Sequence, residues 1–260
     1  MAELVQVVRD ARGVAWLRLE RPEKHNALSA EMLEQLEVAA RGLGADPSVR
    51  VVVLAASGAT FCAGGDLAWM RAQFDMDDDT RRRESRRIAT ALGALSDLTQ
   101  PLIGRIQGNA FGGGVGLASV CDVAIGVVGG KMGLTETRLG LIPANIGPYV
   151  IARMGAARAR EVFMSSRVFG AEEAVRLGLL SRVVAAEALD DAVEAEVVPY
   201  LSCAPGAVGE AKALLRALSG QVSDAQIDLA IDALAKRWES DEAREGLAAF
   251  FDKRAPGWSL

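Results

Sequence analysis

Hydrophobic and polar positions follow two different periods along this chain, and the pattern changes about halfway. Residues 3–10 and 13–20 alternate apolar and polar on either side of a turn at residues 10–13, which predicts a β-hairpin. A longer apolar run without alternation at residues 49–56 indicates a buried strand. The other strands are predicted at residues 101–107, 122–128 and 180–184.

Between the strands, apolar residues recur at a helical spacing. The first such segment begins at Ser29, a favourable N-cap residue, and carries Met32 and Leu36 on one face. Residues 131–143 fit neither period, so we expect an irregular stretch that carries Glu136. Further helices are predicted at residues 66–73, 77–98, 112–119, 145–154, 156–165, 171–177, 186–201, 205–218, 223–238 and 240–252.

The order of these elements indicates the fold class. Strands alternate with helices up to about residue 144, and the remainder is helical apart from one short strand. This order favours an α/β fold with parallel strands. With 260 residues, half of them hydrophobic, the chain can bury one large core with an appendage.

Composition excludes several classes of protein. The net charge of -5 argues against general nucleic-acid binding. No apolar run reaches the roughly 18 residues of a membrane helix, and the acidic start of the chain shows no signal peptide, so we expect a cytoplasmic protein. Cys62, Cys121 and Cys203 form no CxxC pair, and His25 is the one histidine, which disfavours disulfides, a metal site and a Ser-His-Asp triad.

Two glycine-marked turns are the strongest chemical signal. Residues 61–66 (FCAGGD) follow the apolar run at 49–56, and residues 108–114 (GNAFGGG) follow the predicted strand at 101–107. Turns at helix entrances leave backbone N–H groups without partners where the helix dipole favours negative charge. Two such turns side by side could hold one developing oxyanion, which suggests chemistry on an activated carbonyl such as a thioester.

These motifs resemble the crotonase, or enoyl-CoA hydratase/isomerase, superfamily. They occur in the family's order and span nearly the whole chain, so the set is more specific than any single motif. The resemblance implies a β-β-α superhelical core at residues 1–200 that holds CoA and the active site. It also implies a C-terminal helical region for trimerisation at residues 201–260, in a homotrimer or a dimer of trimers. The matching segments are residues 21–28, 61–67, 108–114, 121–122, 135–143, 178–180 and 251–254.

The resemblance also assigns the catalytic groups. In this family the thioester oxygen accepts two backbone N–H bonds, and the matching residues are Gly65 and Gly113. Losing one such donor can cost about 3 kcal/mol of transition-state stabilisation. Family hydratases also use two glutamates, one shortly after the glycine triplet and one twenty residues later. The second position is Glu136 here, but the first is Gly116, so one carboxylate slot is vacant.

A lone carboxylate leaves more than one reaction open. Glu136 can serve as base and then acid in hydration, or it can shuttle a proton between two carbons, which is isomerase chemistry. Burial would raise the pKa of Glu136 and favour its acid role. The leading interpretation is a reversible hydratase. The alternatives are an enoyl-CoA delta-isomerase, an acyl-CoA decarboxylase of the same fold, and a non-catalytic acyl-CoA-binding or RNA-binding relative, although the acidic balance disfavours RNA.

The sequence between residues 112 and 150 looks closest to bacterial methylglutaconyl-CoA and isohexenylglutaconyl-CoA hydratases. The resemblance implies 3-methylglutaconyl-CoA and 3-hydroxy-3-methylglutaryl-CoA as the reacting pair, with coenzyme A entering as part of the substrate and no separate cofactor or metal. Because these acyl groups carry a second carboxylate, an arginine near the pocket would make sense. Arg71 is the candidate, and solvent exposure is its alternative reading.

The remaining candidates concern substrate binding. Asp66 has helix N-capping as an alternative role, Asp122 is expected to be structural, and Asn145 and Tyr149 could line the pocket or pack in the core. The basic run at residues 81–87 is expected to be a solvated helix face. The residues assigned to substrate or CoA binding by the resemblance or by their place in a motif are Lys24, Ala27, Ala63, Gly64, Asp66, Leu67, Arg71 and Lys253.

Overall fold

Two β-sheets form the centre of the molecule. The structure is a computed structural model that describes residues 3–219 and 222–259. The larger sheet has six strands in the order β1-β2-β3-β5-β7-β10, and every neighbouring pair is parallel except β1 and β2. The predicted hairpin and the predicted α/β class are therefore confirmed. These strands are β1 (Val5–Arg9), β2 (Val14–Leu19), β3 (Val51–Ala56), β5 (Leu102–Ile106), β7 (Val123–Val127) and β10 (Arg182–Val184).

A second sheet of four short strands was not predicted. It has the order β4-β6-β8-β9, with β4, β6 and β8 parallel and β9 antiparallel to β8. The prediction that residues 131–143 are wholly irregular is therefore wrong at β8. The two glycine turns come directly after β4 and β6. The sequence instead predicted that they come directly after strands of the larger sheet. The four strands are β4 (Thr60–Cys62), β6 (Asn109–Phe111), β8 (Lys131–Gly133) and β9 (Val168–Gly170).

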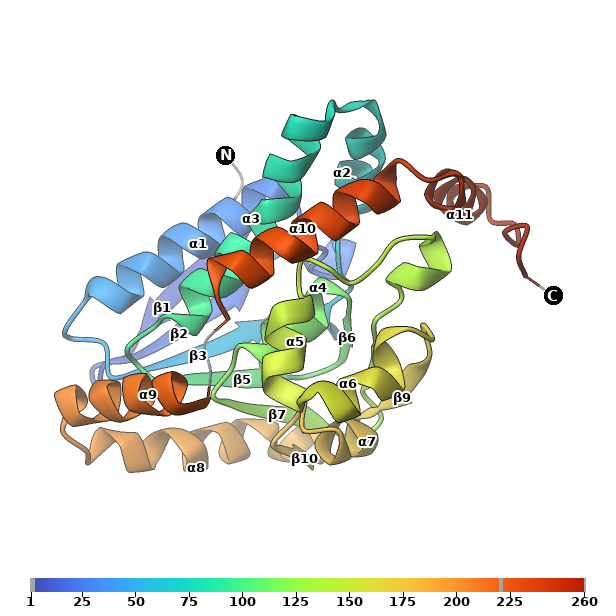
Figure 1. Cartoon of the computed structure of the whole chain (residues 1–260). Coiled ribbons are helices and arrows are strands. Elements are labelled where there is room, and N and C mark those ends of the chain that lie inside the picture. The colour runs from blue at the N-terminus through green and yellow to red at the C-terminus, as the bar shows by residue number, and fades with distance from the viewer. Residues whose placement is uncertain (1–2, 220–221, 260) are drawn as a thin grey trace.

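Helices cover both faces of the larger sheet (Figure 1). Ser29 caps α1, as predicted, by accepting a bond from the Met32 N–H at 3.2 Å. Helices α1 and α3 pack against one face of the sheet, and apolar residues of α8 pack against the other. The bounds are α1 (Ala30–Ala45), α2 (Leu67–Ala72), α3 (Asp78–Ser96), α4 (Gly113–Ser119), α5 (Gly147–Met154), α6 (Ala156–Phe163), α7 (Ala171–Arg176) and α8 (Leu189–Leu201), with single 3-10 turns η1 (Pro22–Lys24), η2 (Gln73–Asp75), η3 (Glu136–Leu139) and η4 (Ala186–Ala188).

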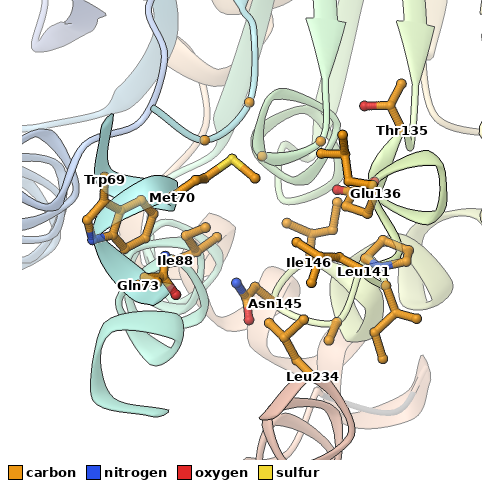
Figure 2. A pocket seen from close by; sticks show the side chains of 18 of the residues that line it. Trp69, Met70, Gln73, Ile88, Thr135, Glu136, Leu141, Asn145, Ile146 and Leu234 are labelled. Atoms are coloured by element: carbon orange, nitrogen blue, oxygen red, sulfur yellow. The ribbon is translucent and has the colours of Figure 1, made fainter. Parts of the chain in front are cut away.

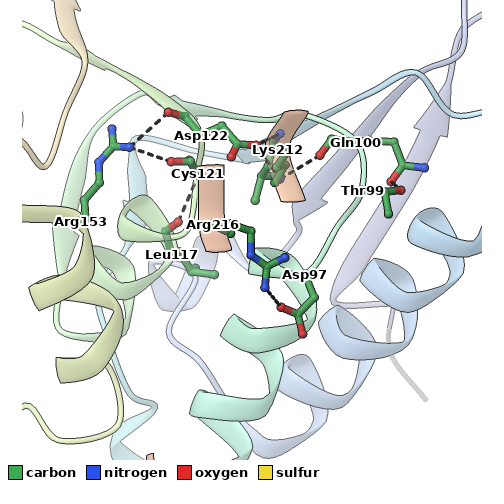
Figure 3. A network of polar contacts seen from close by, with 10 residues as sticks. Asp97, Thr99, Gln100, Leu117, Cys121, Asp122, Arg153, Lys212 and Arg216 are labelled. Atoms are coloured by element: carbon green, nitrogen blue, oxygen red, sulfur yellow. Dashed lines mark hydrogen bonds and ion pairs between the residues drawn. The ribbon is translucent and has the colours of Figure 1, made fainter. Parts of the chain in front are cut away.

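Helix α9 (Pro205–Ser219) is fastened to the core through polar contacts (Figure 3). Lys212 Nζ donates to Asp122 Oδ2 at 2.6 Å and to the Gln100 carbonyl at 3.0 Å. Asp122 Oδ2 also accepts the Leu102 N–H at 2.7 Å, so its predicted structural role is confirmed. Arg216 forms an ion pair with Asp97 one turn further along α9.

The last two helices return to the body of the same chain. Helix α10 (Asp224–Trp238) lies along α3 (Figure 1), and Arg82 and Arg86 of the basic run pair with Asp232 and Asp228 of α10. The basic run is therefore an interhelical contact as well as a solvated face. Helix α11 (Asp241–Phe251) packs against η3. The predicted boundary at residue 200 stays a prediction, and residues 1–2, 220–221 and 260 of the predicted ranges lie outside the described residues.

Candidate active site

The two glycine turns open into a cavity of about 310 Å³. Its walls come from both turns, from η3 and the loop that follows it, and from α2, η2, α3, α10 and α11. Figure 2 shows Glu136 at one end of the view, with Trp69, Met70 and Gln73 on the opposite side. Segments more than a hundred residues apart in the sequence therefore meet at this cavity.

Pairing of β4 with β6 brings the two turns together. A Cβ atom on Gly64, which has φ +97°, would lie 3.2 Å from the Phe111 carbonyl oxygen, so the backbones approach closely where only glycine fits. Gly65 and Gly113 both line the cavity. Within the described residues, neither N–H has a hydrogen-bond acceptor. This arrangement supplies the two free donors that the oxyanion assignment requires, although the role itself stays a prediction.

Glu136 sits at the start of η3, beside the second turn. A Cβ atom on Gly112 would lie 3.1 Å from Glu136 Oε1, which places the carboxylate against the Gly112 backbone. Glu136 Oε2 is inaccessible to solvent and has no partner among the described residues. Burial disfavours the charged form and raises the pKa of Glu136 from 4.5 to about 7, partly offset by a hydrogen bond from its own backbone N–H.

The vacant carboxylate slot at Gly116 is filled by apolar side chains. A Cβ atom there would lie 2.7 Å from Ile146 Cγ2 and 3.0 Å from Leu92 Cδ1. A side chain at residue 116 would therefore require Ile146 or Leu92 to shift. The sequence could not show what occupies this space, because Leu92 and Ile146 come from separate segments.

The loop before α1 is built around a buried amide. Asn26 is fully buried and donates to the carbonyls of Ser57 at 2.8 Å and Thr60 at 2.9 Å. Its Oδ1 accepts the Arg21 N–H at 2.9 Å. Arg21 in turn pairs with Asp66 at 2.8 Å, so this loop is tied directly to the first glycine turn.

The candidate binding residues fall into two groups. Ala63, Gly64 and Leu67 line the cavity, whereas Lys24, Ala27 and Lys253 do not. Lys24 and Lys253 are exposed, so their proposed contacts with CoA stay predictions. Asp66 is the N-cap of α2: its Oδ1 accepts the N–H groups of Ala68 and Trp69, which confirms the capping alternative.

The geometry does not support Arg71 as the partner of an acyl carboxylate. Arg71 is exposed, and its guanidinium carbon lies 4.7 Å from the centre of the Phe251 ring. It is not among the residues that line the cavity. The side chain extends across α11 because a cation over an aromatic face is a favourable contact. The solvent-exposed alternative for Arg71 is therefore the better description.

Sequence reasoning missed part of the cavity wall. Gln73, Leu234 and Trp238 line it from η2 and the end of α10. None of them belongs to a recognisable motif, and α10 reaches the cavity only through tertiary packing on α3 and α5. Asn145 lines the cavity, which is one of the two alternatives that the sequence offers for it. Tyr149 instead packs in the core, where it is buried and its hydroxyl donates to the Ala89 carbonyl at 3.0 Å.

The raised pKa of Glu136 has a consequence for stability. The folded protein holds a proton on Glu136 between pH 4.5 and about 7, where the unfolded chain has lost it, so the free energy of unfolding falls as the pH rises through this window. At about 1.4 kcal/mol per pH unit, the loss of unfolding free energy is up to about 3 kcal/mol.

Glu136→Gln is therefore expected to unfold at higher denaturant concentration than the wild type at pH 8, with the difference disappearing at pH 4. Glu239→Gln, an exposed control, should show no such pH-dependent gain.

Within the part of the chain that the structure describes, two N–H donors without acceptors and one carboxyl group with a raised pKa line the same cavity. Donors of this kind stabilise negative charge that develops on a carbonyl oxygen, and the carboxylate can take or give a proton beside it. Glu136 is the one carboxylate among the described residues that line the cavity. The arrangement suits reactions that pass through an enolate.

Comparison with known proteins agrees with this chemistry. A family model described as enoyl-CoA hydratase/isomerase matches residues 9–259. A mitochondrial methylglutaconyl-CoA hydratase of Mus musculus is 32% identical over 253 residues, covering 94% of this chain and 79% of that protein.

Solved structures show the same likeness over the whole chain. The crystal structure of an enoyl-CoA hydratase from Mycobacterium avium has a TM-score of 0.87 and 33% identity, covering 100% of both chains. The structure of Pseudomonas aeruginosa AtuE has a TM-score of 0.81 and 35% identity, covering 99% of this chain and 100% of that one. The chain therefore belongs to the enoyl-CoA hydratase/isomerase, or crotonase, family of enzymes.

Proposed function

We propose that this enzyme reversibly hydrates a branched 2-enoyl-CoA, with 3-methylglutaconyl-CoA as the favoured substrate, and that Glu136 alone handles the proton. The observation that carries this proposal is the position of Glu136 in the cavity, with a buried, unpartnered Oε2 beside the second glycine turn. The likeness to the methylglutaconyl-CoA hydratase of Mus musculus supports the choice of substrate.

One carboxylate is enough for both proton transfers of the proposed reaction. The ionised Glu136 accepts a proton from water as the water oxygen bonds to the β-carbon and the double-bond electrons move to the thioester oxygen. The N–H groups of Gly65 and Gly113 stabilise the resulting enolate. Glu136 then returns the proton to the α-carbon, so one C–O and one C–H bond form while the π bond and a water O–H bond break. A raised pKa makes this carboxylate a stronger base for the first transfer.

One observation favours a second candidate, an enoyl-CoA delta-isomerase. Isomerisation needs a single group that removes a proton from one carbon and returns it to another. Residue 116 is glycine and supplies no second carboxylate, and Leu92 and Ile146 lie against the point where a side chain would begin. Both candidates share the oxyanion donors and Glu136, so they differ only in whether water is added.

Absorbance at the enoyl-thioester band separates the candidates. We expect the wild-type enzyme to remove the band of 3-methylglutaconyl-CoA by hydration, with slower turnover of crotonyl-CoA. A band that appears when a 3-enoyl-CoA is supplied, without loss from either 2-enoyl-CoA, would establish the isomerase instead. No change in absorbance with any of these substrates would indicate an acyl-CoA-binding protein without this activity and would overturn the proposal.

We further propose that the chain assembles as a homotrimer or a dimer of trimers, in the cytoplasm and with no cofactor beyond the CoA of its substrate. Support for the assembly comes from apolar side chains that the single chain leaves exposed on its C-terminal helices. Leu214, Leu215 and Leu218 on α9 and Leu229 on α10 are each more than 60% exposed. Exposed leucines clustered on one helix are typical of a surface that another subunit covers. Across the described residues, no helix combines the length and apolarity needed to cross a membrane.

A further inference from the structure

Three neutral polar side chains line the cavity without hydrogen-bond partners. They are Gln73 in η2, Asn145 in the loop before α5, and Trp238 at the end of α10. Within the described part of the chain, none of the three side chains has a hydrogen bond. Figure 2 shows Gln73 on the opposite side of the view from Glu136, with Asn145 lower in the view between them. We call these three residues the polar lobe.

Gln73 is held in place by its backbone and not by its side chain. The residue is 4% exposed, and its carbonyl accepts a bond from Arg81 Nε at 3.1 Å. The neighbouring Met76 carbonyl accepts a second bond from the same guanidinium at 2.7 Å, which fixes η2 at the start of α3. The backbone is therefore anchored while the carboxamide is left facing the cavity.

Trp238 is equally buried, and its ring nitrogen is inaccessible and unpartnered. The indole packs edge-to-face on Phe74, with 5.4 Å between ring centres. The other tryptophan of the cavity differs, because Trp69 Nε1 donates to Glu84 at 2.8 Å. Asn145 resembles Trp238 in this respect, since its Oδ1 is inaccessible and has no partner.

Buried polar groups in native proteins nearly always have hydrogen-bond partners, so the two inaccessible atoms of the polar lobe, Trp238 Nε1 and Asn145 Oδ1, call for an explanation. A bound ligand that offers an acceptor explains the unpartnered indole N–H of Trp238. An indole N–H can only donate, and each carboxamide also offers N–H groups. A ligand atom that accepts hydrogen bonds therefore satisfies the indole N–H and can take N–H bonds from both carboxamides, while Asn145 Oδ1 needs a donor of its own.

We propose that the polar lobe binds a hydrogen-bond acceptor at the far end of the acyl chain, such as a carboxylate, through neutral donors. This inference rests on the proposed function, because it assumes that the thioester oxygen lies at Gly65 and Gly113. The acyl chain then runs from these glycines toward α10. Arg138, an exposed residue of η3, is the one cationic residue among the described cavity residues. The polar lobe thus takes the role that the sequence suggested for Arg71.

The test is a binding measurement with acyl-CoAs that cannot react. Calorimetry would compare 3-methylglutaryl-CoA with 3,5-dimethylhexanoyl-CoA, in which an isopropyl group replaces the carboxylate. We expect the wild type to bind 3-methylglutaryl-CoA, the acid, at least tenfold more tightly than 3,5-dimethylhexanoyl-CoA, the apolar analogue. Gln73→Met and Trp238→Phe should each weaken binding of the acid about tenfold, the effect of one hydrogen bond to a charged group, and leave binding of the apolar analogue within twofold.

Trp69→Phe is the matched control, because its N–H already has a partner in Glu84 and should not contribute to the preference. Equal binding of the two analogues by the wild type, or equal weakening of both in Gln73→Met and Trp238→Phe, would overturn the inference. Butyryl-CoA, which is too short to reach the polar lobe, checks that each variant still binds CoA esters. The binding measurement needs no turnover, so the two proposals can fail separately. A protein that does not hydrate 3-methylglutaconyl-CoA but binds 3-methylglutaryl-CoA more tightly than the apolar analogue would refute the proposed hydratase activity and support the role of the polar lobe.

Discussion

Glu136→Gln is expected to lower kcat for hydration by about a thousandfold, the middle of the range for a positioned acid or base. Glutamine keeps the shape of the side chain and can still hold a water, but it cannot accept a proton from that water or deliver one to the α-carbon. Because the same side chain performs both transfers in the proposed mechanism, a single substitution removes both. Initial rates of loss of the enoyl-thioester absorbance, measured at saturating 3-methylglutaconyl-CoA, give the change in kcat directly.

The substrate should still bind to this variant. Its KM is expected to change by less than about threefold, because the substitution keeps the size of the side chain and leaves the two glycine N–H groups and the other cavity residues unchanged. Glu239→Gln, which alters an exposed glutamate at the end of α10, serves as the control and should retain wild-type rates. A Glu136→Gln enzyme within tenfold of wild-type kcat would show that another group carries the proton.

Gly116→Glu, which restores the carboxylate found in other hydratases of the family, is expected to destabilise the protein and not to increase its activity. The new Cβ would lie 2.7 Å from Ile146 Cγ2 and 3.0 Å from Leu92 Cδ1. Overpacking of this kind costs about 1–3 kcal/mol, and an unpartnered buried polar group adds about 1–3 kcal/mol more. Denaturant unfolding should therefore show a loss of about 2–6 kcal/mol relative to the wild type.

Gly42→Glu provides the matched control, because it makes the same change in a helix where a Cβ atom would meet nothing within 4 Å. Adding Ile146→Ala to Gly116→Glu should recover part of the lost stability, since it removes the clashing methyl group, and this recovery would appear as non-additivity in a double-mutant cycle. If Gly116→Glu were as stable as Gly42→Glu and more active than the wild type, the slot would be open, and the claim that Ile146 and Leu92 obstruct it would be wrong.

Long elements with clear periodicity could be predicted from the sequence, whereas short ones could not. The buried strand at 49–56 and the long helix at 77–98 correspond to β3 and α3 within a few residues. Strands β4, β6, β8 and β9 have three residues each, too few for an alternating pattern to emerge from one sequence. They form because each pairs with a neighbouring strand, and that pairing depends on the tertiary fold.

The same limit applies to the active site. Glu136, Gly65 and Gly113 belong to motifs with characteristic spacing, so they could be identified before the structure was known. Gln73 and Trp238 belong to no motif and reach the cavity through the packing of α2, α3 and α10. The position of Arg71 one turn into α2 favours a place near the cavity, but its guanidinium lies over the Phe251 ring and the residue does not line the cavity.

The central claim is that Glu136 alone adds water across the double bond of a branched enoyl-CoA. The most direct test is to incubate 3-methylglutaconyl-CoA with the wild-type enzyme and with Glu136→Gln in ¹⁸O-labelled water, and to measure the label in the product by mass spectrometry. We expect wild-type enzyme to form a hydroxyacyl-CoA with one labelled oxygen, and the variant to form about a thousandfold less of it in the same time. A product without label, or equal labelling by the two proteins, would contradict the claim.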